Sequence, residues 1–248
     1  NLIIIKLILD YKKKKKKAAI FDKNQLIAIK AFKKISLKNI SDFTSLYNID
    51  SAIISSVINY NSDIYNYLNT NYYFKELTSD TPIPVKNTYL TPDTLGKDRL
   101  AAVVAANDLY PESDMLVINA GTCITYDFID KNKKYHGGAI SPGITMRFKA
   151  LHTFTDKLPL IENTKKLTPL IGNDTEKSIL SGVINGTIAE IKNIISDYNQ
   201  KYSHLNVVIS GGDMKYFDKI IKNSIFAYPN IVLYGLNLIL DFNAKKEF

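Results

Sequence analysis

Along the first part of the chain, short apolar runs alternate with segments in which apolar residues recur every three or four positions. Apolar runs that are rich in β-branched residues and bounded by turn residues are typical of strands, whereas the longer period is typical of helices. We expect helices at 40–47 and 64–68. We expect strands at 2–9, 18–21, 26–29 and 52–58, the last one mostly apolar and therefore covered on both faces. The chain should open as a strand meander and then alternate strands with helices.

The same order of elements begins again after residue 112. Three prolines between residues 78 and 92 indicate a loop ahead of a helix at 95–109. Ser141 and Pro142 suit the start of another helix, and Asp174 suits the cap of a long amphipathic helix. Strands are expected at 115–118, 123–129, near 139 and at 207–210, and helices from 141 to about 154, at 175–198 and at 232–240. We therefore predict an α/β protein with two domains, residues 1–112 and 113–248.

The charge balance changes this picture little. A chain of 248 residues with 46% hydrophobic residues can bury a substantial core. Its net charge is +8, but subtracting the six lysines of the run Lys12 to Lys17 leaves only +2 for the rest. The basicity is therefore local. Nucleic-acid binding through the lysine run is the least favoured of the interpretations, and we expect no nucleic-acid partner.

Cysteine content and the opening segment bear on the compartment. Cys123 is the one cysteine of the chain, so an internal disulfide is excluded and a reducing compartment, the cytoplasm, is expected. The apolar segment 2–9 is short, contains Lys6 and precedes its basic run instead of following one. It therefore resembles neither a signal peptide nor a membrane span, and we expect no membrane partner.

A polar tetrapeptide opens the helix expected at 95–109. It reads Gly96-Lys97-Asp98-Arg99, at a helix start where free backbone amides and the helix dipole favour anions. An arginine can bind a carboxylate through two hydrogen bonds, and an aspartate can accept the proton of a hydroxyl that attacks phosphorus. A plain ion pair at a helix start explains the same residues, so this motif alone does not decide the function.

Two glycine-containing turns, and a third segment of small or rigid residues ahead of a helix, could bring the backbone close to a ligand. The turn Asn119-Ala120-Gly121-Thr122 lies between two expected strands and offers amides and a hydroxyl to phosphate oxygens. Gly211-Gly212-Asp213 follows a strand and could let a flat adenine or ribose lie on the backbone. The third is the segment 137–143, with Gly137-Gly138 and Ser141-Pro142-Gly143. Ordinary hairpin and strand-to-helix turns are the alternative for all three.

Taken together, these motifs resemble the type III pantothenate kinases in content and in order, over almost the whole chain. The resemblance rests on Tyr89 with 95–99, on 119–125, 137–143, 175–186 and 210–213. It implies the fold of actin, sugar kinases and heat-shock ATPases, in which two ribonuclease-H-like domains with mixed sheets flanked by helices enclose a nucleotide cleft. The start of the helix at Asp98 and the turn at Gly121 should then face one cleft.

The resemblance also implies an activity and roles for individual residues. The activity is transfer of phosphate from ATP to the hydroxyl of pantothenate, which gives 4′-phosphopantothenate in the first step of coenzyme A biosynthesis. Asp98 matches the proton acceptor. The residues that match pantothenate contacts are Tyr89, Gly96, Lys97, Asp98, Arg99 and Thr175. Those expected at ATP are Asp10, Lys17, Gly121, Thr122, Gly211 and Gly212. Thr175 completes the pocket of the neighbouring subunit in the family, so a homodimer with shared active sites is implied.

Two regions depart from the family pattern, the cation position at Asn119 and the first phosphate loop. Mg²⁺ is expected to bridge the phosphate oxygens, with Asp10 as a candidate ligand. Family members also use a monovalent cation, potassium or ammonium, held in part by an aspartate that aligns with Asn119, where an amide should bind the cation more weakly. The first phosphate loop keeps Asp10 and Lys17 at its ends, but Lys12, Lys13 and Lys14 replace Gly, Asn and Thr. Flexible lysines do not supply the fixed hydrogen bonds of that loop, so weakened or lost ATP turnover is expected.

Two other functions stay open at this point. A catalytically impaired binding protein would keep the fold and the dimer, and the lysine run and Asn119 favour it. Another kinase of the same fold is the nearest enzymatic alternative, because a fold does not determine its substrate. The choice of pantothenate depends on Tyr89, Asp98, Arg99 and Thr175.

Overall fold

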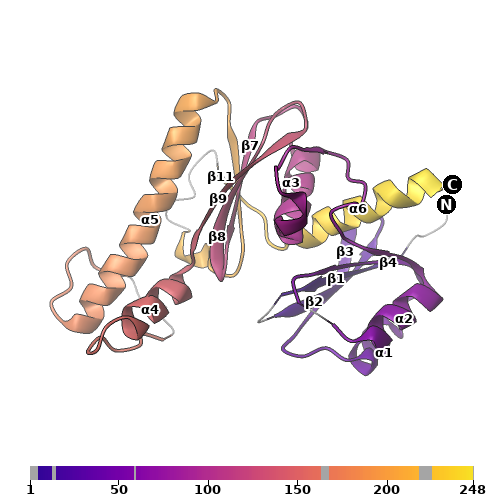
Figure 1. The fold of residues 1–248 in the computed structure, drawn as a ribbon, viewed down its shortest axis with the longest axis horizontal. Helices are drawn as coiled ribbons and strands as arrows, with labels where there is room; N and C mark the ends of the chain where they lie inside the picture. The colour runs from indigo at the N-terminus through magenta and orange to yellow at the C-terminus, as the bar shows by residue number, and fades with distance from the viewer. Residues whose placement is uncertain (1–4, 13–14, 59, 163–167, 218–224, 248) are drawn as a thin grey trace. The chain divides into compact units, whose positions relative to one another are not determined.

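A computed structural model describes residues 5–12, 15–58, 60–162, 168–217 and 225–247 (Figure 1). The structure is α/β, with two mixed sheets flanked by helices, as predicted. The chain divides into two compact units. Unit 1 comprises Asn1–Leu109, Lys133–Tyr135 and Asn230–Phe248, and unit 2 comprises Tyr110–Asn132 and His136–Pro229. The domain boundary between residues 112 and 113 stays a prediction, and the last helix groups with unit 1.

The sheet of unit 1 has five strands in the order β3-β2-β1-β4-β5. The first three form the expected antiparallel meander, and β4 and β5 continue the sheet in parallel with β1. The prediction of an opening meander is thus confirmed, although residues 2–4 of the first expected strand lie outside the described residues. The strands are β1 (Ile5–Tyr11), β2 (Lys16–Asp22), β3 (Gln25–Phe32), β4 (Ile49–Ser56) and β5 (Tyr73–Glu76).

Strand β1 is buried on both faces because helices cover the sheet on both sides. Leu7 and Leu9 pack with α1 (Leu37–Thr44) and α2 (Ser62–Asn71) on one face. The alternate residues face α6 (Ile231–Glu247), where the ammonium of Lys6 lies 2.6 Å from a carboxylate oxygen of Asp241. The apolar run of β1 is therefore interrupted by one lysine that has a partner on the covering helix.

The helices α3 (Lys97–Leu109) and α6 pack directly against each other in unit 1. Residues 99–107 of α3 are all buried. Their close approach requires Gly235, because a Cβ at that position would come within 1.7 Å of the carbonyl oxygen of Ala101. Two smaller elements of unit 1 are the 3₁₀ helix η1 (Pro92–Thr94) and β6 (Lys86–Asn87), which pairs in parallel with Lys134 and Tyr135.

The strands of unit 2 run in the order β11-β10-β7-β8-β9. Strands β7 and β8 form the expected hairpin, and β10 and β11 extend the sheet in parallel from β7. Figure 1 shows the long orange helix α5 beside α4. The elements are β7 (Met115–Ala120), β8 (Cys123–Ile129), β9 (Lys134–Pro142), α4 (Ile144–Thr153), α5 (Thr175–Lys201), β10 (Asn206–Ser210), η2 (Met214–Tyr216) and β11 (Ile225–Ala227).

The longest helix follows its prediction closely. Apolar residues of α5 at three- and four-residue steps, among them Ile184 and Ile191, pack on the apolar face of β7 and β8. The carboxylate of Asp174 accepts a hydrogen bond of 2.7 Å from the backbone N–H of Lys177, which confirms the predicted cap. None of the helices in the described part of the chain combines the length and the hydropathy that a bilayer crossing would need.

Replacement of Gly235 by alanine tests the contact between α3 and α6. The added methyl group would meet a backbone oxygen, so the helices must move apart, and we expect Gly235→Ala to lower the free energy of unfolding by about 1–3 kcal/mol. Urea unfolding followed by circular dichroism measures this. Gly186→Ala is the matched control, because the site on α5 is open and alanine favours a helix by roughly 0.5–1 kcal/mol. Equal stability of both variants would contradict the close contact.

Candidate functional site

The residues singled out in the sequence fall into two groups, one in each unit. Unit 1 holds Asp10, Lys17, Tyr89, Gly96, Lys97, Asp98 and Arg99. Unit 2 holds Asn119, Gly121, Thr122, Thr175, Gly211 and Gly212. That the two groups face one cleft stays a prediction, and each group is described within its own unit.

Asp98 lies in the first turn of α3 and is paired with Lys12. The ammonium of Lys12 is 2.8 Å from Oδ2 of Asp98, while Oδ1 accepts the backbone N–H of Arg99 at 3.0 Å. Lys12 directly follows β1, so the end of β1 and the start of α3 meet here. The ammonium group of Lys12 is thus not a freely solvated charge. Lys13 and Lys14, the other altered positions of the loop, lie outside the described residues.

Asp10, near the end of β1, carries a buried carboxyl group with only 4% of its surface exposed. Loss of water on burial raises its pKa from 3.8 to about 6, and the negative charge of Asp98 adds to this, while Lys12 and Lys17 act in the opposite direction. For Lys12, burial lowers the pKa, but the carboxylates of Asp10 and Asp98 outweigh burial and raise it. Asp10, Lys12, Lys17 and Asp98 therefore form one charge cluster.

Lys17 stands directly opposite Asp10 in the β1–β2 hairpin, so the two ends of the altered loop are paired. Its ammonium donates a 2.7 Å hydrogen bond to Oδ1 of Asn230, the residue that precedes α6. Burial lowers the pKa of Lys17, although Asp10 opposes this shift. Asn230 was not found by sequence reasoning, because its partner lies more than two hundred positions away.

A buried arginine and two aromatic rings adjoin the start of α3. Arg99 is 5% exposed, and its guanidinium carbon lies 5.5 Å from the centre of the Tyr89 ring. Tyr89 in turn stacks on Tyr135, with ring centres 6.3 Å apart and planes at 11°. Lys97 points elsewhere, since its ammonium donates to the carbonyl of Pro92 at 3.4 Å. Sequence reasoning did not single out Tyr135, because a tyrosine in a strand is common and carries no functional signal.

Unit 1 also contains a cavity of about 880 Å³ that the sequence did not indicate. It lies at the end of β4, where Ser56 stands opposite Tyr11 of β1 in the parallel register. The carboxyl edge of neighbouring parallel strands is where α/β proteins commonly bind ligands. The cavity is lined by Ser56, Val57, Ile58, Tyr60, Ser62, Tyr65 and Glu76.

In unit 2, the turns at Gly121 and Gly211 meet the end of β9. Residues 137–142 belong to strand β9, and the helix expected from Ser141 begins only at Ile144, with Gly143 as its N-cap. The carbonyl of Thr122 accepts the backbone N–H of Gly143 at 3.1 Å, and the carbonyl of Ala120 accepts that of Asp213 at 3.1 Å. Asn119, at the end of β7, stands between Thr125 of β8 and Ser210 of β10. Residues 119–122, 143 and 211–213 thus lie together, and we call them the backbone-lined site.

Glycine is required at two positions of this backbone-lined site. Gly211 has a φ of +106°, and a Cβ there would lie 2.0 Å from the carbonyl oxygen of Ala120. A Cβ at Gly143 would lie 2.0 Å from the carbonyl oxygen of Gly121. Side chains at these positions would force the turns apart, so the glycines keep backbone next to backbone.

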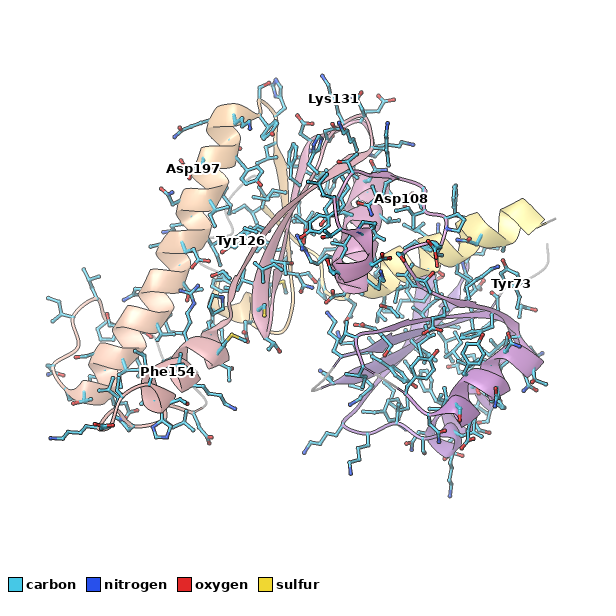
Figure 2. All side chains as sticks on the ribbon, viewed as in Figure 1. Tyr73, Asp108, Tyr126, Lys131, Phe154 and Asp197 are labelled. Carbon is cyan, nitrogen blue, oxygen red and sulfur yellow. The ribbon has the colours of Figure 1, made fainter. Side chains whose placement is uncertain are left out.

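A charged network holds the turn at Gly143, and sequence reasoning missed it. Arg147 of α4 donates from Nε to the carbonyl of Pro142 at 2.8 Å and from Nη2 to Oγ of Ser141 at 2.7 Å. Nη2 also pairs with Glu190 of α5, which accepts a 2.8 Å hydrogen bond from the hydroxyl of Tyr126 on β8. Although partial burial opposes it, these hydrogen bonds hold the pKa of Glu190 below its usual value. Figure 2 shows Tyr126 between the sheet and α5.

Thr175, the first residue of α5, lines a groove of about 1,140 Å³ in unit 2. The groove lies between α4, the segment that follows it and the start of α5. Phe154 belongs to its lining and is 85% exposed, and Figure 2 shows it at the end of α4. Leu170 and Ile171, which precede α5, are 83% and 80% exposed. Unit 2 therefore presents apolar surface next to Thr175.

The donors present can be tested for a divalent cation. In the described ranges, no group of three or more His, Cys, Asp or Glu side chains gathers in the manner of an all-protein metal site. Mg²⁺ does not require such a group, because one or two carboxylates together with substrate phosphates hold it in many phosphoryl-transfer enzymes. Burial disfavours the ionised form of Asp10, and a dication beside it would compensate that charge. The carboxylate of Asp10 is therefore suited to hold Mg²⁺.

Comparison with known proteins gives a consistent result. The family model described as type III pantothenate kinase matches residues 13–197. The type III pantothenate kinase of Christiangramia forsetii is 46% identical over 93% of this chain and 95% of its own length, and that of Phocaeicola vulgatus is 47% identical over 96% and 99%. A glucokinase structure from an Antarctic psychrotroph covers 97% of this chain and all of its own, with a TM-score of 0.53 and 12% identity, and so shares the fold.

The burial of Asp10 predicts a pH-dependent stability. Because its pKa is about 6 in the folded protein and 3.8 when the carboxyl group is fully solvated, the folded state binds the proton more tightly, and stability is lost as the pH rises through this window. We expect Asp10→Asn to increase the free energy of unfolding at pH 8, by up to about 3 kcal/mol, and to change it little at pH 4. Urea unfolding at the two pH values measures this.

The matched control for this measurement is Asp42→Asn, which changes an exposed carboxylate on α1. Asp42→Asn should change the free energy of unfolding little at both pH values. An equal effect of Asp10→Asn at pH 4 and pH 8 would show that the carboxyl group does not titrate differently in the folded protein.

Proposed function

The chain belongs to the type III pantothenate kinase family, and we propose on this basis that it transfers a phosphoryl group from ATP to pantothenate. The product is 4′-phosphopantothenate, and the reaction is the first step towards coenzyme A. The observation that supports this most directly is the charge cluster at the start of α3, where the carboxylate of Asp98 lies among Lys12 and the buried Asp10. A carboxylate of this kind can act as the proton acceptor that a phosphoryl transfer to a hydroxyl requires.

The roles of the unit 1 residues follow from this chemistry. Asp98 accepts the proton of the pantothenate hydroxyl. The hydroxyl oxygen forms a bond to the terminal phosphorus of ATP as the bond between that phosphorus and the ADP oxygen breaks. The backbone N–H of Arg99 fixes Oδ1 of Asp98, so Oδ2, which the ammonium of Lys12 contacts at 2.8 Å, is the oxygen proposed to accept the proton. Arg99, held against Tyr89, is the candidate partner of the pantothenate carboxylate. Gly96 and the main chain of Lys97 are proposed to contact the substrate at the start of α3, since the Lys97 side chain is directed to the carbonyl of Pro92.

ATP is the co-substrate, and Asp10, Lys17 and the backbone-lined site of unit 2 are its proposed contacts. Asp10 would hold Mg²⁺, which when bound neutralises phosphate charge. Gly121, Gly211 and Gly212 let the backbone approach the nucleotide, and the Thr122 hydroxyl adds a hydrogen bond. A potassium or ammonium ion is proposed at Asn119, with lower affinity than a carboxylate would give because the amide oxygen carries no net charge.

We further propose a homodimer in which Thr175 contributes to the pocket of the partner. The groove beside Thr175 and the exposed side chains of Phe154, Leu170 and Ile171 support this, because contiguous apolar surface on a folded protein marks contact sites. The cytoplasm is the proposed compartment, in line with the single cysteine and with the use of ATP.

Replacement of Asp98 tests the proposed chemistry. We expect Asp98→Asn to reduce kcat by roughly 10²- to 10⁴-fold, because an amide cannot accept the proton, while the fold stays intact. A coupled assay with pantothenate, ATP, Mg²⁺ and potassium measures kcat. Asp93→Asn, an exposed position in η1 only five residues earlier, is the matched control and should turn over like the unaltered protein.

The same assay distinguishes the proposed enzyme from an impaired binding protein. Turnover by the unaltered protein that disappears in the Asp98 variant supports the kinase. Absence of turnover together with calorimetric binding of pantothenate would instead support a binding protein whose altered loop no longer performs the transfer. Absence of both would overturn the proposed function.

The dimer proposal is tested at the apolar surface next to Thr175. We expect Ile171→Glu to shift the protein towards the monomer, because a buried charge at an interface is costly, and to lower activity in parallel. Sedimentation velocity measures the oligomeric state. Leu46→Glu, a similarly exposed leucine in unit 1, serves as the control and should leave association unchanged. A protein that is monomeric without any substitution would refute this proposal.

A further inference from the structure

We propose that Lys12 is a phosphate-binding residue, which is held on Asp98 in the unliganded protein and transfers to the terminal phosphate of a bound polyphosphate. This proposal rests on the proposed function. It assigns a role to a lysine that stands where the family pattern has glycine, at the point where the altered loop leaves β1. The loop would thus have replaced a backbone donor by a charged side chain.

The position of Lys12 is set by the hairpin. Its backbone N–H donates a 3.1 Å hydrogen bond to the carbonyl of Lys15, which closes the turn between β1 and β2. With the main chain held there, the side chain reaches α3 and places its ammonium 2.8 Å from Oδ2 of Asp98. The lysine is therefore located by two contacts, one from its main chain and one from its side chain.

The ammonium group retains capacity for a further ligand. It carries three N–H donors, of which Asp98 takes one at 2.8 Å. Its side chain is 35% exposed and that of Asp98 is 24% exposed, so the ion pair remains accessible from solvent. An incoming phosphate oxygen can bind the ammonium without first opening the protein core.

The local charges show why this lysine matters. Asp10 and Asp98 contribute two negative charges, which would repel a polyphosphate, and Lys12 and Lys17 balance them. Lys17 is already engaged with Asn230, and burial lowers its pKa. Without Lys12 the cluster would present a net negative charge to the phosphates. A negative site does not attract a polyanion, so Lys12 decides whether these four groups are neutral or carry a net negative charge.

The other described lysines of the run do not share this position. Lys15 is exposed to solvent, and Lys16 donates to the carbonyl of Lys33 at 3.2 Å on the exposed side of the hairpin. Lys12 therefore differs from Lys15 by its place next to Asp10 and Asp98, whereas both carry the same charge. This difference separates specific phosphate binding from general attraction to a basic run.

Calorimetric titration with inorganic tripolyphosphate tests the proposal. We expect Lys12→Met to weaken tripolyphosphate binding by roughly 10- to 100-fold, the range of a charge-assisted hydrogen bond. Lys12→Arg should keep the affinity within about threefold, because the positive charge and donors are retained. The control Lys15→Met removes the same charge from the same run and should bind like the unaltered protein, and thermal unfolding of each variant reports whether the fold is kept.

Steady-state kinetics adds a second readout. The KM for ATP of Lys12→Met should rise by a similar factor, whereas calorimetric binding of pantothenate without nucleotide should stay unchanged or tighten, because Asp98 is released. Equal tripolyphosphate affinity of the Lys12→Met and Lys15→Met proteins would overturn the proposal. The binding result does not depend on turnover. Lys12-dependent binding in a protein without kinase activity would sustain this inference while the proposed function fails. Kinase activity together with equal tripolyphosphate affinity of the two variants would sustain the proposed function while this inference fails.

Discussion

Burial of a carboxyl group at the end of β1 is the constraint on which the rest of unit 1 depends. Asp10 loses its water on the central strand, and proteins tolerate a buried charge only where other charges or hydrogen bonds compensate it. Lys12 and Lys17 supply opposite charge from the same hairpin, and Asn230 and Asp98 hold these lysines from α6 and α3. The loop, the two helices and the strand are thereby joined through one electrostatic cluster, which explains why such a costly group can be kept.

Unit 2 achieves its backbone-lined site by different means. Here main-chain atoms approach each other at Gly143 and Gly211, where side chains would collide with carbonyl oxygens. Charged side chains support the turn by direct contacts, since Arg147 donates to the carbonyl of Pro142 and pairs with Glu190. Main-chain amides bind phosphate with fixed geometry, whereas charged side chains bind and release protons. Unit 2 thus offers main-chain atoms at its turns, whereas unit 1 offers charged side chains.

The lysine run gains a different meaning from its tertiary surroundings. As a sequence it predicts mutually repelling, flexible charges that cannot replace a phosphate loop. In the structure Lys12 and Lys17 each have a defined partner, and they flank a buried carboxylate. The repulsion between neighbouring lysines is offset because their side chains reach different elements. The altered loop therefore still supplies donors next to Asp10, although their kind has changed.

The sequence by itself determined the elements and the types of reactive residue. The apolar run of β4, the period of α5 and the cap at Asp174 are local signals, and each was found because neighbouring residues carry it. The strands β5, β6 and β11 were missed, since two to four residues are too few to show a period. The turns at Gly121 and Gly211 were recognised by composition, but their contact was not.

Only the tertiary structure decided which residues meet. Lys12 and Asp98 are 86 positions apart, and Arg147 and Glu190 are 43 apart, so no local pattern contains either pair. Periodicity reports whether a residue faces a core, but the choice of partner follows from the register of strands and the packing of helices, where burial makes an unpaired charge costly.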